Sequence, residues 1–398
     1  MPVWIVLYNL FRFGFALVFV GLHCALMVGL FREWRWDHQR SGAGDISQDR
    51  GAAFPETALP QAENPKVSVI IPLRNEARRM GGLLASLVRQ DYPLTEFIFI
   101  DDRSSDGTIG LLREFAKKRE GVTIIALEEN PGPNHKQYAL NRGIEAASGT
   151  LLLFTDADCE VPPGWIRAMT RRMRENRIGV IIGPVFKKHG GKGFFHLYQC
   201  FDHAVRYMYL AGSTGLGAAG GGFGNNLILS REALQAIGGY GTIPPSPTED
   251  AALISRIRSH SNYAIHSACG KDAAVETAGE SSWKALINQT LRWNNGGLFS
   301  PDKTTRLNFG FLMITISMGM LAIPLVPFIP SLWPLPGAVF FAMTLNTIAT
   351  LAIFGSSLPK KGAAYGLQLI FTPMYFTFLT LLSFFGVKVD WKGSQVSS

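Results

Sequence analysis

The longest uncharged stretch of the chain constrains its fold most, because no Asp, Glu, Lys or Arg occurs between Arg306 and Lys360. A helix of about 20 apolar residues crosses the roughly 30 Å hydrocarbon core of a bilayer. The stretch therefore has room for two such helices, separated by the helix-breaking sequence SLWPLPG at residues 331–337. A further uncharged run covers residues 362–387. We expect residues 301–398 to form a C-terminal membrane region with two to three transmembrane helices.

The N-terminal part of the chain holds another candidate span. Phe13 to Phe31 carries no charged residue, and three arginines follow within residues 32–40. The positive-inside rule places the residues after the span in the cytosol. The segment lacks the features of a removable signal peptide. We expect residues 1–38 to form a retained transmembrane helix with its basic flank, in the plasma (inner) membrane, and a buried core helix is the alternative.

The number of C-terminal spans stays open at this point. Three crossings after a cytosolic middle segment would leave Lys388 and Lys392 outside, against the preference of lysines for the cytosolic side. Alternatively, the prolines at positions 324, 327 and 330 make the first of these helices interfacial or re-entrant.

Composition narrows the remaining classes of protein. Hydrophobic residues make up 47% of the chain and charged residues 17%, which excludes an intrinsically disordered chain. The four cysteines have no CxxC or CxxH spacing, so neither a zinc site nor a disulfide framework is predicted. The formal net charge of +8 suits nucleic acid, anionic lipid or phosphorylated ligands alike, so the positions of the charges have to decide.

The middle of the chain has the pattern of an α/β domain that follows a linker at residues 39–64. Short apolar runs lie at Val67–Ile71, Phe97–Ile100, Val122–Ala126 and Leu151–Phe154, and helix-like stretches at Gly82–Gln90, Thr108–Arg119 and His135–Ala147. Such alternation predicts buried parallel strands in a doubly wound sheet with crossover helices, within residues 65–300.

Acidic side chains follow two of these predicted strands. Asp101 and Asp102 follow the second run, and Asp156 and Asp158 follow the fourth. Doubly wound sheets bind ligands beyond the carboxyl ends of their strands. Carboxylates there accept hydrogen bonds from ribose or base groups, and two of them one residue apart can bind the same divalent cation. The pattern indicates a metal and a phosphate, while helix capping is the alternative, above all for Asp106.

A formal match to the dinucleotide fingerprint GxGxxG occurs at Gly215–Gly220 (GLGAAG). The residues GGFGNN follow it in place of a helix, so the context that the fingerprint requires is missing. We interpret Gly215–Gly224 as a glycine-rich loop.

Six segments, in order, resemble the motifs of family-2 glycosyltransferases: VSVIIPLRNE (67–76), IDDRSSDGT (100–108), HKQYALNRGIEAASGTLLLFTDADC (135–159), GGFGNNLILSREALQAIGGY (221–240), TED (248–250) and QTLRW (289–293). The similarity covers about residues 65–297, and the flanking spans resemble the membrane-bound branch that carries QxxRW. The resemblance implies a GT-A fold, a nucleotide-diphosphate sugar donor, a divalent cation and inversion at the anomeric carbon.

The same resemblance assigns the donor site. The positions that hold the nucleoside match four residues, namely Pro72, Glu76, Asp101 and Asp102. Asp156 and Asp158 match the DxD motif, in which Asp158 is the expected direct ligand to Mg²⁺ or Mn²⁺. Lys136 is expected to assist at phosphate, and a solvated surface lysine is the alternative.

The resemblance makes Asp250 of the TED segment the catalytic base, which takes the proton from an attacking acceptor hydroxyl. Glu249 beside it is the alternative base. In the QTLRW segment, Arg292 suits a diphosphate and Trp293 a sugar, and Gln289 completes the motif. An interfacial helix with Arg and Trp at headgroup depth is the alternative interpretation of this segment.

Together these features predict an inverting, metal-dependent glycosyltransferase that moves a sugar, with a UDP-sugar as the expected donor, to a lipid or lipid-linked acceptor at the cytosolic membrane face. The stretch Gly193–Leu210 is either an amphipathic helix at the membrane surface near this acceptor or a core helix. The alternatives are a processive polysaccharide synthase and a non-catalytic scaffold that binds nucleotide sugars. We expect no nucleic-acid partner and no obligate protein partner.

Overall fold

The computed structural model describes residues 3–41, 64–175, 177–188, 191, 193–360, 362–387, 389–391 and 394–396. The chain forms two compact units, and each is built from segments far apart in the sequence. The sheet unit consists of Arg32–Phe186 and Gly221–Ala278, and the helical unit of Met1–Phe31, Lys187–Gly220 and Gly279–Ser398. Most of the predicted linker, residues 42–63, lies outside the described residues. The domain boundaries proposed from the sequence stay predictions.

A seven-stranded mixed sheet forms the centre of the sheet unit, in the order β3-β2-β1-β4-β8-β6-β9. The strands are β1 (Val67–Leu73), β2 (Thr95–Asp101), β3 (Val122–Ala126), β4 (Leu151–Phe154), β6 (Ile178–Ile182), β8 (Leu227–Ser230) and β9 (Ala264–Ser267). Val69 of β1 pairs in parallel with Phe97 of β2 and with Leu153 of β4, and β2 pairs in parallel with β3. The four predicted strands and their parallel direction are therefore confirmed.

Strand β8 runs against both of its neighbours, since it pairs antiparallel with β4 and with β6. The sheet is therefore mixed, whereas the sequence predicted parallel strands. An apolar run such as LILS predicts burial but not direction, because a strand buried on both faces has the same composition either way. A smaller sheet contains β5 (Cys159–Glu160), β10 (Val275–Thr277) and β7 (Val185–Lys187).

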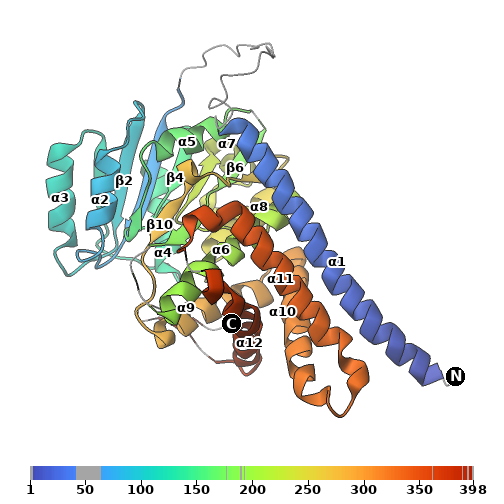
Figure 1. Cartoon of the computed structure of the whole chain (residues 1–398). Helices are drawn as coiled ribbons and strands as arrows, with labels where there is room; N and C mark the ends of the chain where they lie inside the picture. The colour runs from blue at the N-terminus through green and yellow to red at the C-terminus, as the bar shows by residue number, and fades with distance from the viewer. Residues whose placement is uncertain are drawn as a thin grey trace. The chain divides into compact units, whose positions relative to one another are not determined.

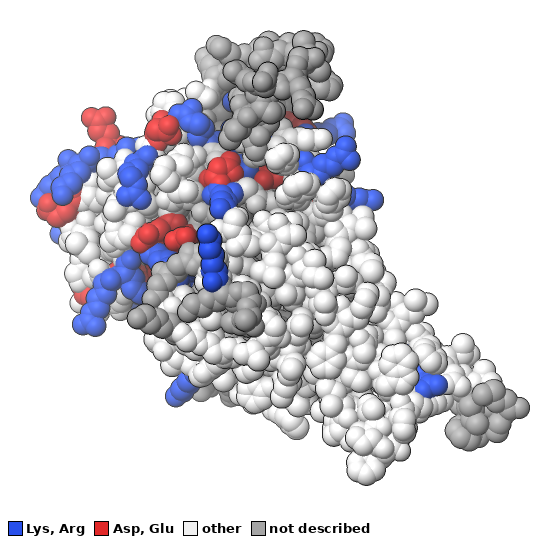
Figure 2. All heavy atoms as spheres, in the orientation of Figure 1, with Lys and Arg blue, Asp and Glu red and all other residues white. Residues whose placement is uncertain are grey.

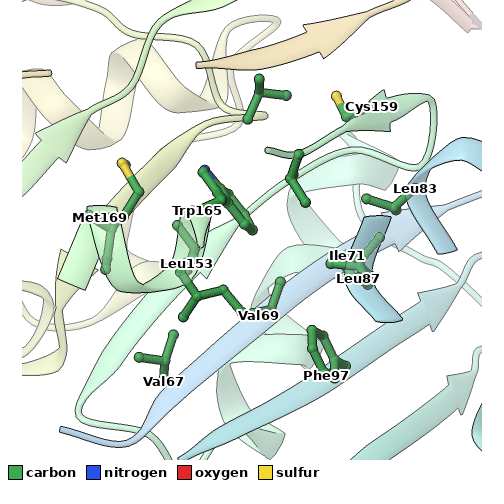
Figure 3. Close-up of a cluster of buried hydrophobic side chains, with 14 of the residues drawn as sticks. Val67, Val69, Ile71, Leu83, Leu87, Phe97, Leu153, Cys159, Trp165 and Met169 are labelled. Atoms are coloured by element: carbon green, nitrogen blue, oxygen red, sulfur yellow. The ribbon is translucent and has the colours of Figure 1, made fainter. Parts of the chain in front are cut away.

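Helices cover both faces of the large sheet. Successive residues of a strand point to opposite faces, and Val67, Val69 and Ile71 of β1 point into one buried cluster (Figure 3). The helices that contribute to this cluster are α2 (Gly81–Val88), α3 (Thr108–Lys118) and α5 (Trp165–Arg172). The remaining helices of this unit are α4 (His135–Ala146), α7 (Arg231–Ala236) and α8 (Glu249–His260), with the short turns η2 (Tyr240–Thr242) and η3 (Lys271–Ala273).

Helix α4 packs on the opposite face of the sheet, where Ile70 and Ile100 point. A Cβ atom at Gly143 would lie 2.6 Å from Cδ1 of Ile100 and 2.8 Å from Cγ2 of Ile70. A glycine at this position therefore allows α4 to lie directly on β1 and β2. This contact also fixes Lys136, in the first turn of α4, relative to the sheet.

The C-terminal end of α1 (Val3–Arg40) belongs to the sheet unit. Arg172 of α5 is fully buried and pairs with Asp37 of α1 and with Asp272, whose Oδ2 lies 2.9 Å from its Nη1. Asp37 is 2% exposed, and its Oδ2 also accepts hydrogen bonds from the two backbone N–H groups of residues 269–270. Buried charges are stable only where hydrogen bonds satisfy them in this way. Residues 32–38, predicted as the basic flank of the first span, are thus held by the sheet unit, and α1 continues to Arg40, two residues into the predicted linker.

The helical unit contains long apolar helices (Figure 1). In the described part of the chain, four helices are long and apolar enough to cross a membrane, and they lie in α1, α10 (Lys303–Ala322), α11 (Pro334–Phe354) and α12 (Gly362–Phe384). The other elements of this unit are α6 (Phe194–Gly215), α9 (Trp283–Leu298), η6 (Gly355–Ser357), β11 (Val389–Trp391) and β12 (Ser394–Val396). On the face drawn in Figure 2, the surface over α10 and α11 is nearly free of charged side chains.

The break between α10 and α11 begins earlier than the predicted breaker at residues 331–337. It contains two short 3₁₀ turns, η4 (Ile323–Leu325) and η5 (Pro330–Leu332). Pro324 and Pro327 lack the backbone N–H that a continuing helix needs. Pro334, in contrast, begins α11, because a helix tolerates proline in its first turn.

Helices α1 and α6 approach each other closely within the helical unit. A Cβ atom at Gly29 would lie 2.0 Å from the carbonyl oxygen of Gly212, so neither helix has room for a side chain there. Nearby, Nδ1 of His23 donates to the carbonyl of Phe19, and its Nε2 accepts from the hydroxyl of Tyr209 over 2.9 Å. These contacts hold the N-terminal part of α1 against α6.

Candidate active site

Two turns at the carboxyl ends of β1 and β2 hold each other in place. Asn75 and Arg103, one in each turn, both have a φ of 56°, in the left-handed region that non-glycine residues rarely adopt. The backbone N–H of Asn75 donates to Oγ of Ser104 over 2.8 Å, and Oδ1 of Asn75 accepts from the N–H of Ser105 over 2.8 Å. Strained residues of this kind persist where the surrounding structure fixes them, often at functional sites.

Asp106 has the contacts of a structural cap. Its Oδ1 accepts from the N–H of Thr108 over 2.9 Å, and its Oδ2 accepts from the N–H of Ala77 over 3.2 Å. The alternative that this carboxylate caps the start of α3 therefore fits the geometry.

Asp101 and Asp102 are buried at the end of β2. Oδ2 of Asp101 accepts from the N–H of Ser104 over 3.2 Å, and Oδ1 of Asp102 lies 2.9 Å from Nε of Arg103. Among the residues that the structure describes, none donates to the buried Oδ1 of Asp101. A buried acceptor without a donor costs about 1–3 kcal/mol. This oxygen is therefore available to a donor group on a ligand.

Arg79 connects the end of β1 to the DxD segment. Its Nη2 lies 2.7 Å from Oε2 of Glu76, and its Nη1 lies 3.8 Å from Oδ2 of Asp158. Pro72, also predicted at the nucleoside, lies within β1. The structure thus brings the predicted residues of the first and fourth strand ends to the same edge of the sheet.

Lys136 joins the DxD and TED segments. Its Nζ lies 3.0 Å from Oδ1 of Asp156 and 3.3 Å from Oε1 of Glu249. Asn134 caps α4 by accepting from the N–H of Gln137 over 3.1 Å, which places Lys136 in the first turn. Burial alone would lower the pKa of Lys136, but the carboxylates of Asp156 and Glu249 raise it above its ordinary value. Lys136 is therefore a charged member of the site.

The DxD carboxylates have the chemistry of a divalent-cation site. In the described residues, no group of three or more His, Cys, Asp and Glu side chains comes together to hold a metal. Asp156 and Asp158 nevertheless present hard oxygen ligands one residue apart, and both are partly exposed. Mg²⁺ is commonly bound by one or two carboxylates together with substrate phosphates. The two residues fit a cation that arrives with a diphosphate.

Asp250, the second residue of α8, is held by two backbone donors. Its Oδ2 accepts from the N–H of Gly224 over 2.8 Å, and its Oδ1 accepts from the N–H of Ala251 over 2.8 Å. Burial and the neighbouring carboxylate of Glu249 raise the pKa of Asp250 to about 6, while Lys136 and the two N–H groups oppose this change. A pKa near neutrality suits a general base.

Asp250 and Glu249 differ in their availability to a substrate. Glu249 is 5% exposed and paired with Lys136, whereas Asp250 is partly exposed and touches the glycine-rich loop through Gly224. The geometry therefore favours Asp250 over Glu249 as the group that an acceptor hydroxyl reaches.

The QTLRW segment lies on α9, in the helical unit. Nε2 of Gln289 donates to Oε1 of Glu280 over 2.6 Å. The ring of Trp293 packs against Arg206 of α6, whose Cζ lies 5.3 Å from the ring centroid. Arg292 is partly exposed. The predicted site residues are thus divided, with Gln289, Arg292 and Trp293 in the helical unit and the others in the sheet unit.

Three residues that contact the predicted site residues were not themselves predicted from the sequence, namely Arg79, Arg206 and Glu280. Arg79 follows Glu76 by one helical turn, and this spacing was a usable signal. Arg206 and Glu280 belong to no motif, and only the folded chain brings them to Trp293 and Gln289.

Residues 68–238 match the family described as Glycosyl transferase family 2. The chain carries a domain of this family. The match begins at β1 and runs past the DxD residues and β8 to the end of α7. The prediction of a family-2 glycosyltransferase domain with a GT-A fold is confirmed for these residues.

Two relatives of the chain are synthases. The chain is 24% identical over 279 residues to a beta-monoglucosyldiacylglycerol synthase of Trichormus variabilis, a match that covers 67% of this chain and 58% of that protein. It is 27% identical over 259 residues to a poly-beta-1,6-N-acetyl-D-glucosamine synthase of Staphylococcus epidermidis, covering 62% of this chain and 60% of that protein. The chain thus spans about three fifths of the length of these relatives.

Among solved structures, the chain is similar to a mannosyltransferase, PcManGT from Pyrobaculum calidifontis, in complex with GDP-Man and Mn²⁺. The TM-score is 0.53 at 19% identity, and the match covers 92% of this chain and 95% of that one. This likeness is one of fold.

Proposed function

We propose that this chain is an inverting, metal-dependent membrane glycosyltransferase that transfers a sugar from a nucleotide-diphosphate sugar, with a UDP-sugar as the expected donor, to a lipid or lipid-linked acceptor. The observation that carries the proposal is the arrangement around Lys136. This lysine contacts Asp156 of the DxD motif and Glu249 of the TED segment, and Asp250 lies partly exposed next to Glu249. Donor-binding and proton-accepting groups are therefore neighbours.

The nucleoside would bind at the ends of β1 and β2. The buried Oδ1 of Asp101 suits an N–H of the base, because no described residue donates to it. Asp102 and Glu76 are buried carboxylates at the same edge and suit ribose hydroxyls. Pro72 completes the predicted nucleoside set.

The diphosphate would lie against the DxD segment. Asp158, with Asp156, would hold Mg²⁺ or Mn²⁺, and the solved relative with Mn²⁺ supports this choice of ion. When bound, the cation supplies positive charge that stabilises the leaving nucleoside diphosphate. Lys136 would add a charged donor to the same phosphates.

Asp250 would act as the general base. Its carboxylate accepts the proton of the acceptor hydroxyl while that oxygen forms a bond to the anomeric carbon. The bond from this carbon to the diphosphate oxygen breaks on the opposite face, and the diphosphate leaves with the electron pair. A single displacement of this kind inverts the anomeric centre.

The acceptor would come from the membrane. Four helices long and apolar enough to cross a bilayer accompany the domain, and one relative is named as a diacylglycerol glycoside synthase. We place the sheet unit on the cytosolic side of the plasma (inner) membrane, because arginines follow the first span. On the helical unit, Arg292 is proposed to bind a phosphate and Trp293 a sugar, with Gln289 as the third residue of their motif.

The test is turnover by the purified full chain in lipid nanodiscs. UDP-sugars and GDP-mannose are supplied with Mn²⁺, and nucleotide release and lipid products are followed by mass spectrometry. We expect single-sugar products, which D250N makes far more slowly. Long products would favour the processive synthase, which the Staphylococcus relative represents. Donor binding without any turnover would favour the scaffold.

A further inference from the structure

We infer that Arg79 binds the diphosphate of the nucleotide-sugar donor, as a second cation of the chain beside Lys136. The inference rests on the proposed function, because it adds one contact to the same donor. Arg79 lies outside the six motif segments, three residues after the first of them ends. Its assignment therefore comes from its contacts in the folded chain, all of which lie within the sheet unit.

Arg79 contacts one carboxylate from each of the two parts of the proposed donor site. Its Nη2 lies 2.7 Å from Oε2 and 2.9 Å from Oε1 of Glu76, which belongs to the proposed nucleoside set. Its Nη1 lies 3.8 Å from Oδ2 of Asp158, the proposed metal ligand. In a nucleotide sugar the diphosphate joins the nucleoside to the sugar, so it has to pass from the first part to the second. An arginine that contacts both parts lies along this path.

The guanidinium of Arg79 has N–H groups available to a ligand. Among the residues that the structure describes, Arg79 donates a side-chain hydrogen bond only to Glu76, through Nη2, since the 3.8 Å from Nη1 to Asp158 is too long for one. Arginine carries its N–H donors in a planar fork that matches phosphate oxygens. The side chain is 51% exposed, so a ligand can reach it. Nη1 and Nε can therefore donate to phosphate while Nη2 stays with Glu76.

The charges of the DxD segment also call for a second cation at this place. Lys136 is shared between two carboxylates, since its Nζ lies 3.0 Å from Oδ1 of Asp156 and 3.3 Å from Oε1 of Glu249. Asp158 has Arg79 as its one Lys or Arg partner among the described residues. A bound diphosphate brings further negative charge beside these carboxylates. Charge-assisted hydrogen bonds from Arg79 offset this repulsion on the side that Lys136 does not cover.

The neighbouring arginines differ from Arg79 in their contacts. Nε of Arg103 lies 2.9 Å from Oδ1 of Asp102, and Nη1 of Arg74 lies 3.8 Å from Oδ2 of the same carboxylate. Both therefore pair with the nucleoside set alone. Arg78 is exposed and has no ion pair within the described part of the chain. It carries the same charge one position away from Arg79 and is therefore the matched control.

The competing interpretation is that Arg79 has only a structural role. Glu76 and Arg79 are three residues apart in one turn, and the backbone N–H of Arg79 donates to the carbonyl of Glu76 over 2.9 Å. In that case Arg79 affects the donor only by orienting Glu76 toward the ribose. The affinity for the nucleoside then depends on Arg79, whereas a phosphate contact changes only the affinity for ligands that carry phosphate. The two interpretations therefore differ in which ligands lose affinity.

The test is calorimetric titration of the purified full chain in lipid nanodiscs with uridine and UDP, and with guanosine and GDP. Each titration is done with Mn²⁺ and again with EDTA. In R79M, which keeps the aliphatic stem, we expect the affinity for the nucleoside diphosphate to fall by roughly 10–100-fold in both media, with nucleoside affinity unchanged. R79K keeps a point charge without the fork and recovers part of the loss. R78M lowers the net charge equally and binds every ligand like the parent chain.

Three results would overturn the inference. Equal losses for nucleoside and nucleoside diphosphate in R79M would mean that Arg79 only orients Glu76. A loss confined to Mn²⁺ would mean that it acts through Asp158 and the cation. Unchanged affinities in R79M, or the same loss in R78M, would exclude a specific contact. Failure of the proposed function has a different sign: a parent chain that binds UDP and GDP no more tightly than their nucleosides would show that the proposed donor itself is wrong.

Discussion

The Nζ atom of Lys136 lies 3.3 Å from Oε1 of Glu249, and the positive charge of Lys136 also acts on the adjacent Asp250. Lys136 lowers the pKa of Asp250, against burial and the charge of Glu249, which raise it to about 6. In the proposed mechanism, deprotonated Asp250 is the active form of the base, so we expect transfer to be lost as the pH falls through this pKa.

K136M removes that cation and keeps the aliphatic stem. The pKa of Asp250 then rises, and the acid limb of the transfer rate moves to higher pH by about one unit or more. The pH dependence of transfer at saturating donor measures this shift. K117M, on an exposed lysine that pairs with Glu114, is the control and keeps the normal profile. An unchanged acid limb in K136M would show that Lys136 does not affect the pKa of the base.

D250N keeps the shape of the side chain but removes its basicity. We expect transfer to fall by roughly 10²–10⁴-fold, while metal-dependent UDP affinity stays the same. E249Q reduces transfer less, because the buried Glu249 acts through Lys136. Rates and UDP affinities of both variants, compared with those of the parent chain, decide between the two carboxylates. Collapse of transfer in E249Q with near-normal transfer in D250N would assign the base to Glu249.

D158A tests the metal site. We expect Mn²⁺-dependent UDP binding to weaken by at least the roughly 10–100-fold that the loss of an outer-shell partner costs. Calorimetry with and without Mn²⁺ measures it. D91A, at an exposed carboxylate paired with Arg167, is the control. Metal-dependent binding of normal strength in D158A would exclude Asp158 as the ligand.

D37N tests the attachment of α1 to the sheet unit. It leaves the fully buried Arg172 with only the partly exposed Asp272. Removing one partner of a buried ion pair costs about 3–5 kcal/mol, so we expect a clearly lower melting temperature of the purified chain. D91N, which breaks an exposed pair, changes stability by ~0.5 kcal/mol or less. Equal melting temperatures would mean that Asp37 contributes nothing.

The sequence predicted the strands β1 to β4 to within two residues, because strands buried on both faces form short apolar runs. It did not predict that α1 continues through Arg32–Arg40, since charged residues end the apolar pattern there. The partners of those residues, such as Arg172, are more than a hundred residues away, and a local pattern carries no information about them.

The site was predicted in its residue types but not in its connections. Spacing and motif order located Asp156, Asp158 and Asp250. The Lys136 contacts that join the DxD and TED segments, and the Gly224 N–H that holds Asp250, depend on the tertiary fold. Glu280, which accepts from Gln289, lies outside every motif and had no sequence signal.

The Arg172 cluster also has a consequence for the synthesis of the chain. Asp272 follows Arg172 by 100 residues, and the whole of α6 is made between them. At about 5–20 residues per second, the ribosome needs roughly 5–20 s to add that carboxylate. During this interval Asp37 is the one of the two carboxylate partners of Arg172 that has already been synthesised. The buried charge cluster of the sheet unit is therefore completed only after α6 has been made, and until then its arginine relies on a carboxylate of the N-terminal helix.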